Sequence, residues 1–161
     1  MRDNHLVPAD TTQTNTSEAL REQVWRALLG LATSAAYADR CVAARCLALF
    51  AGIDDVDQRL VLLACDAEDS SVTLAAVDAL AKRADGVGWR LIVEAFATEP
   101  ESYTRERMIE AIENALAWDW ITPEDGLHEL QACASDGAPE LATAAAEILR
   151  EISVPTADAP A

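Results

Sequence analysis

Residues 69–80 of this chain read DSSVTLAAVDAL, and this short segment carries the pattern on which the predicted fold depends. Counting from Val72, the residues three, four, seven and eight positions further on are apolar, namely Ala75, Ala76, Ala79 and Leu80. In an α-helix this spacing places all five side chains on one stripe, and the small alanines allow a neighbouring helix to approach closely. The segment therefore predicts a helix that packs tightly against another helix.

The same spacing recurs along the chain. Patterned stretches begin at Val42, Val72, Met108 and Leu141, roughly 33 residues apart. Their members besides those of residues 72–80 are Val42, Arg45, Cys46, Leu49 and Phe50; Met108, Ala111, Ile112, Ala115 and Leu116; and Leu141, Ala144, Ala145, Ile148 and Leu149. Arg45 is the one member that does not fit the apolar pattern. A second apolar segment follows each of the first three stretches. Because neither member of such a pair buries its apolar face alone, the repeat predicts stacked helix pairs around a continuous core.

Apolar spacing and helix breakers together predict eight helices. They span residues 17–33, 37–51, 56–67, 70–84, 87–98, 103–118, 123–134 and 139–152. Asp69 and Thr122 are natural N-caps, and Pro123 suits a first helical position. No segment alternates with period two, so we expect an all-α fold in one domain over residues 17–152. Residues 1–16 are polar and residues 153–161 contain two prolines, which predicts a tail at each end.

Residues 69–80 resemble the first helix of a HEAT repeat, which opens with Asp, continues with Val-Arg and carries paired alanines before Ala-Leu. The departure is Thr73, because the family often uses an arginine there to form a ladder along the stack. Ala43, Ile109 and Ala142 occupy the corresponding positions, so no ladder is expected. Over residues 18–152 the resemblance implies an armadillo-like, right-handed α-solenoid of antiparallel helix pairs, and a binding scaffold rather than an enzyme.

In HEAT proteins the second helix of each pair usually lines the inner, concave face, so the resemblance implies a partner-binding surface there. The candidate residues on these helices are Asp57, Gln58, Arg59, Trp89, Arg90, Glu94, Glu124, His128, Glu129 and Gln131. Trp120 is a further candidate, because Trp118-Asp119-Trp120 ends a predicted helix and tryptophan is a frequent hot-spot residue. Trp118 is expected to close the core.

The chain carries 12 basic and 28 acidic residues, a formal net charge of -16, which repels nucleic-acid phosphates and anionic membranes. Between Met108 and Leu149 there is no Lys or Arg. We therefore expect a protein partner with a basic surface, with this chain acting as a scaffold or as an inhibitor or immunity-type protein. No apolar run approaches the ~20 residues that span a bilayer, and no signal-peptide pattern is present, which favours a cytoplasmic location.

The sequence contains no pattern typical of a catalytic, metal or cofactor site. Its four cysteines, Cys41, Cys46, Cys65 and Cys133, form no CxxC pair and have no histidines nearby, which predicts free thiols in apolar surroundings. Two alternatives stay open. One is an enzyme component resembling HEAT-like lyases or chaperones, with its chemistry near Cys65, His128 or Cys133. The other is an architectural subunit of a larger complex. The chain is expected to be a monomer or a weak homo-oligomer.

Overall fold

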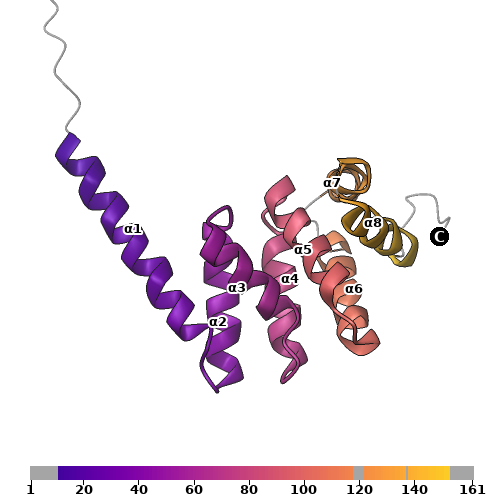
Figure 1. Ribbon diagram of the computed structural model, residues 1–161, viewed down its shortest axis with the longest axis horizontal. Helices are drawn as coiled ribbons and strands as arrows, with labels where there is room; N and C mark the ends of the chain where they lie inside the picture. Colours follow the sequence, from indigo (N-terminus) through magenta and orange to yellow (C-terminus); the bar gives the residue numbers. More distant parts are fainter. Residues whose placement is uncertain (1–10, 118–121, 137, 153–161) are drawn as a thin grey trace, which may run out of the picture.

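The computed structural model describes residues 11–117, 122–136 and 138–152, and every regular element within these ranges is helical (Figure 1). The elements are α1 (Thr11–Leu31), α2 (Tyr37–Leu47), the short 3-10 helix η1 (Ala48–Phe50), α3 (Asp54–Ala64), α4 (Ser70–Ala81), α5 (Gly86–Thr98), α6 (Ser102–Ala117), α7 (Pro123–Asp136) and α8 (Pro139–Glu151). The described residues contain no strand, so the predicted all-α class is confirmed for them.

The first helix is longer than the sequence pattern predicts. α1 begins at Thr11, inside the segment expected to be a tail, because each residue added to an existing helix gains a hydrogen bond while only one residue is ordered. Residues 1–10 and 153–161, the rest of the two predicted tails, lie outside the described residues. Trp118 and Trp120 also lie outside them.

Side-chain caps start several helices where the sequence predicts. The Asp69 carboxylate accepts a hydrogen bond from the Ser71 N–H at 2.8 Å and opens α4. Before α7, the Thr122 hydroxyl accepts one from the Asp125 N–H at 3.2 Å. Asp85, which was not singled out, opens α5 by accepting from the Gly88 N–H at 2.9 Å. These caps satisfy N–H groups that have no partner within their helix.

The helices pack in two layers. α2, α4 and α6 lie side by side with α4 in the middle, and α3 and α5 lie next to one another against them (Figure 1). α7 extends the second layer by packing on α5. α8 packs mainly against α5 and α7 rather than against α6, so the last pair departs from the alternation of the earlier ones. This departure brings the start of α8 beside α5 and α7, where it helps to form the cleft described below.

The core confirms the predicted stripes of α4 and α6 but not that of α2. Val42 and Leu49 are exposed to 48% and 71%, whereas Ala43, Ala44 and Leu47 are completely buried. The α2 stripe was therefore placed in the wrong register. Residues 41–50 are apolar on two overlapping stripes, so spacing alone does not decide which of them faces α4.

The corrected register of α2 aligns Ala43, Ala44 and Leu47 with the buried Ala76, Val77 and Leu80 of α4. In that alignment Arg40, and not Ala43, corresponds to Thr73. The expectation that no arginine occupies this position in any repeat is therefore wrong for α2.

Arg40 is only 6% exposed and joins two inter-helix loops. Its Nε donates to Asp66 Oδ2 at 2.8 Å and its Nη2 to Asp66 Oδ1 at 3.1 Å, a bidentate pair. Its Nη1 donates to the carbonyl oxygens of Ser34 and Ala35 at 2.9 and 3.2 Å. Asp66 also accepts from the N–H groups of Glu68 and Asp69, at 3.0 and 2.9 Å. This network fixes the loop before α2 to the loop before α4.

Replacing Arg40 with Met is expected to destabilise the fold strongly. The substitution leaves the Asp66 carboxylate, whose side chain is 10% exposed, without its charge partner, and it leaves two loop carbonyls without a donor. The matched control is Arg26→Ala, which removes an exposed i,i+4 ion pair with Glu22. In urea unfolding followed by circular dichroism, the loss for Arg40→Met should exceed that for Arg26→Ala several-fold. Equal losses would contradict the structural role of the network.

Candidate functional site: the cleft between α5 and α7

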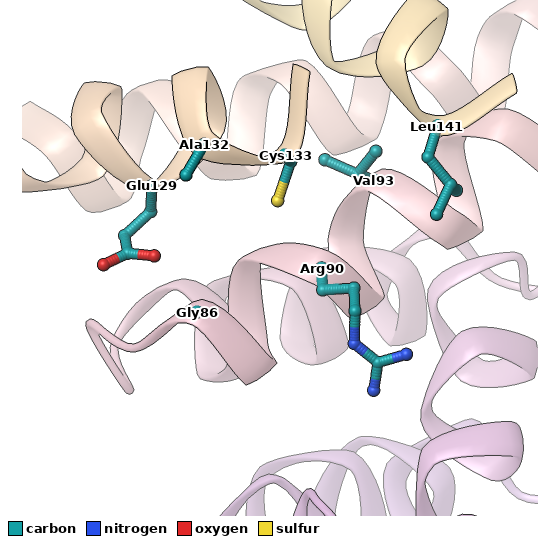
Figure 2. Close-up of a pocket in the computed structure, with 7 residues that line it drawn as sticks. All are labelled: Gly86, Arg90, Val93, Glu129, Ala132, Cys133 and Leu141. Carbon is teal, nitrogen blue, oxygen red and sulfur yellow. The ribbon is translucent and has the colours of Figure 1, made fainter. Parts of the chain in front are cut away.

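A cleft of about 220 Å³ opens between α5 and α7, with the first turn of α8 at one end (Figure 2). Its wall is mostly apolar and is formed by Val93, Ala132, Cys133 and Leu141. Two charged residues, Arg90 of α5 and Glu129 of α7, and Gly86 complete the lining. The Glu129 and Cys133 side chains point from α7 toward α5, whereas the Arg90 guanidinium points away from α7 (Figure 2).

Two glycines determine how closely α5 and α7 approach. A Cβ atom at Gly86 would lie 3.1 Å from Glu129 Oε2, so the missing side chain leaves room for that carboxylate over the first turn of α5. A Cβ atom at Gly126 would lie 2.7 Å from Leu116 Cδ2 and 3.1 Å from Trp89 Cζ2. Gly126 therefore allows α7 to lie directly on the Trp89 ring. This close contact holds the start of α7 against α5.

The two charged residues of the cleft differ in their electrostatic surroundings. Arg90 Nη2 lies 3.5 Å from Asp57 Oδ2 of α3, and its Nη1 lies 3.9 Å from Glu94 Oε2. Within the part of the chain that the structure describes, the Glu129 carboxylate has neither a hydrogen bond nor a salt bridge. The net charge around the cleft is therefore negative. The Arg90 guanidinium pairs with the carboxylates of Asp57 and Glu94, and the Glu129 carboxylate has no ion-pair partner among the described residues.

The structure brings only some of the candidate residues to this cleft. Arg90 and Glu129 line it, and Asp57 and Glu94 lie next to it through their contacts with Arg90. Asp57 also has a structural task, since its Oδ1 accepts from the Gly52 N–H at 2.7 Å in the turn before α3. Glu124 and His128 are exposed on α7, and Arg59 is half-buried on α3. Trp120 lies outside the described residues.

Trp89 was expected on the partner-binding surface, and the structure contradicts this. Its side chain is completely buried, with Gly126 packed against its ring. The resemblance assigned Trp89 to a helix but not to a side of it, and the inward side of α5 carries this residue. Trp89 is therefore a core residue and does not belong to the candidate surface.

The apolar wall was not predicted as a site. Cys133 was considered only for possible chemistry, while Leu141 was assigned to an apolar stripe. Glycines near the starts of two successive second helices, at Gly86 and Gly126, were the available signal for a close approach. The cleft itself depends on where α8 docks, which no local pattern encodes.

The thiols of Cys133, in the cleft, and Cys65, at the end of α3, are poor nucleophiles. Burial raises the pKa of Cys133, and the nearby Glu129 carboxylate raises it further. Burial also raises the pKa of Cys65 to about 11, with a further contribution from Glu99. Both groups therefore stay protonated near neutral pH, whereas the thiolate is the reactive form.

Alkylation of native Cys65 is expected to be slow at neutral pH and to accelerate only as the pH approaches about 11. An unfolded cysteine, with a pKa of about 8.5, reacts at much lower pH. Iodoacetamide labelling at several pH values, read by peptide mass spectrometry, measures the difference, and the same protein in denaturant is the control. Native Cys65 labelling as fast as the denatured control at pH 7.5 would contradict the expectation.

Within the described ranges, no three or more His, Cys, Asp or Glu side chains form a group suited to a metal ion. In the same described ranges, none of the helices has the length and apolar character needed to cross a membrane. Compared with protein-family models, with curated proteins and with solved structures, the chain gives no match in any of the three.

Proposed function

We propose that this protein is a non-catalytic binding scaffold, a HEAT-like right-handed α-solenoid whose face along α3, α5 and α7 engages a basic protein partner. The cleft is the centre of the proposed contact. Its apolar wall suits one apolar side chain of the partner, and such anchors in pockets carry much of the energy of protein interfaces. The acidic excess of the chain would steer a basic surface toward it.

The observation that carries the proposal is the position of Glu129. Its carboxylate is half-buried at the rim of an apolar cleft and has no hydrogen bond or salt bridge among the described residues. A lysine or arginine beside the partner's apolar anchor would supply the missing counter-charge, and a partly desolvated ion pair is stronger than an exposed one. The expected recognition element is therefore an apolar residue next to a basic one.

The thiol chemistry weighs against the lyase-type alternative. Cys65 and Cys133 both have raised pKa values, which is the opposite of the shift that activates a cysteine nucleophile. An architectural subunit of a larger complex could use the same face. It would differ from the proposed scaffold in that its contact with the partner would be permanent.

A displayed library of random peptides provides a defined probe of the proposal. Peptides selected on the wild-type protein should carry an apolar residue adjacent to Lys or Arg, and their affinity should fall as salt rises. Glu129→Lys and Ala132→Phe, which reverse the rim charge and fill the cleft, should each weaken binding about tenfold or more, or about 1.4 kcal/mol. Glu18→Lys and Ala146→Phe change exposed residues of α1 and α8 outside the cleft and should leave binding unchanged.

Two results would overturn the proposal. Selection of peptides that lack basic residues and bind equally well at low and high salt would contradict the electrostatic part of the proposal. Alternatively, the cleft variants and their matched controls could bind the same peptides with the same affinity, which would place the contact elsewhere on the molecule.

A further inference from the structure

The N-terminal half of α1 extends beyond the body of the protein (Figure 1). Trp25, Leu28, Leu29 and Leu31, in its C-terminal half, pack against the core, and Ala32 just beyond its end is buried. Leu20 and Val24 do not, and their side chains are exposed to 60% and 43%. Isolated helical segments of this length are marginally stable in water, so this part of α1 would gain from packing against another helix.

One side of this helix is exposed and uncharged. With 3.6 residues per turn, Leu20, Val24 and Ala27 fall within about 60° of one another around the axis, and Gln23 lies beside them. All four are exposed. Glu18, Glu22 and Arg26 fall on the other side of the helix, where Arg26 Nη2 pairs with Glu22 Oε1 at 2.6 Å. Arg21 faces the body, with its guanidinium 5.4 Å from the centre of the Phe50 ring.

The neutrality of α1 contrasts with the rest of the chain. Within α1, Glu18 and Glu22 are balanced by Arg21 and Arg26, whereas the whole chain has a net charge of -16. Two copies therefore repel one another over most of their surfaces, since like charges across an interface oppose association. A basic partner, in turn, has no electrostatic reason to select a neutral face. The uncharged face of α1 is the surface on which a second copy meets the least repulsion.

We propose that two copies of this chain associate through the uncharged face of α1. The two helices are antiparallel, and the two-fold axis crosses this face at the level of residue 22 along the helix. A helix face packed against its own copy is self-complementary, as a two-fold interface requires. In this arrangement Leu20 of one copy faces Val24 of the other. The small Ala27 and the exposed Gly30, whose Cβ position is open, allow close approach at each end.

The antiparallel arrangement also separates the two acidic bodies. With an axis at the level of residue 22, the C-terminal ends of the two α1 helices, at Leu31, lie about 27 Å apart along the helix direction at 1.5 Å per residue, so the bodies lie toward opposite ends of the pair. Added salt screens the remaining repulsion between the bodies, since the Debye length is about 8 Å at physiological ionic strength and shorter in more salt. Parallel helices would place the bodies side by side. The dimer is therefore expected to persist or strengthen as salt rises, opposite to the proposed binding of a basic partner.

Analytical ultracentrifugation of the full chain over a range of concentrations tests the proposal. The wild type should shift from monomer to dimer and no further. The double variant Leu20→Glu, Val24→Glu should raise the dimer dissociation constant at least tenfold. Its circular dichroism spectrum should remain that of the folded protein. Leu62→Glu is the matched control, because Leu62 is also 60% exposed but lies on α3, and it should dimerise like the wild type.

Single-cysteine substitutions at the same positions test the orientation. A mixture of Leu20→Cys and Val24→Cys proteins should form a disulfide-linked heterodimer under mild oxidation, while neither variant alone links above the wild-type background. Linkage of each variant with itself would instead indicate parallel helices and overturn the antiparallel arrangement. A wild type that stays monomeric at every concentration, or a dimer that survives the double substitution, would overturn the interface. Neither outcome bears on peptide binding at the cleft, so the two proposals fail independently.

Discussion

Gly88→Ala is expected to unfold much of the protein. A Cβ atom at Gly88 would overlap the carbonyl oxygen of Leu80 and approach its carbonyl carbon to 3.3 Å. The obstacle is the backbone of α4, which does not move aside as a flexible side chain would. Overfilling a packed site typically costs about 1–3 kcal/mol and more where the backbone must shift. We expect a loss of about 3 kcal/mol or more, a large part of the stability of a small domain.

Gly30→Ala is the matched control for this substitution. Gly30 is also helical, but a Cβ atom there meets nothing within 4 Å. Alanine at such a site is expected to stabilise the protein by about 0.4–1 kcal/mol, because it restricts the unfolded chain without a clash. Urea unfolding of both variants measures the difference. Similar stabilities for the two variants would show that α4 and α5 are not as close as the structure places them.

Trp89→Ala is expected to destabilise the protein by about 3–5 kcal/mol, the usual cost of removing a buried large aromatic side chain. Trp89 is completely buried and packs under Gly126, so its loss leaves a cavity between α5 and α7. If Trp89 were a surface contact instead, the same substitution would leave folding almost unchanged. Thermal or urea unfolding therefore distinguishes the structural placement of Trp89 from the one expected from its helix.

Trp89→Phe separates the packing of the ring from its polar group. The Trp89 Nε1 is buried and has no hydrogen-bond partner, so phenylalanine removes an unsatisfied N–H while keeping most of the apolar contact. We expect a loss of about 1 kcal/mol or less. A loss as large as that of Trp89→Ala would mean that the Nε1 group makes an essential contact. Trp25→Ala, at a partly buried position on α1, should cost less than Trp89→Ala.

Local patterns predicted the helices but not always their rotation. In α6 the apolar stripe is flanked by polar residues, and spacing identified Met108 and Ile112 as core. The stripe of α4 is also core at Val72 and Leu80, although most of that helix is apolar. In α2 nearly every residue from 41 to 50 is apolar, and the predicted Val42 stripe proved to face outward. Helix rotation is settled by the surface that a neighbour offers, and periodicity indicates it most clearly when one side of the helix is polar.

The predicted partner-binding residues divide in the same way. Helix assignment placed Arg90 and Glu129 on α5 and α7, and the structure brings both to one cleft. It did not predict that Trp89 faces the core. Neighbouring residues on a helix differ by about 100° in direction, so Trp89 and Arg90 point to different surroundings. The apolar wall of the cleft includes Leu141, whose position depends on the docking of α8 beside α5.

By itself, the sequence determined the all-helical class of the described residues, the caps at Asp69 and Thr122 and the acidic charge, because propensity, capping and composition act over a few residues or sum over all of them. Only the tertiary structure decided the register of α2, the burial of Trp89 and the cleft between α5 and α7. The pairing of Arg40 with Asp66 belongs to the same group, since the two residues are 26 positions apart in the sequence. Such contacts depend on how whole helices pack, and packing is a property of surfaces that local sequence does not encode.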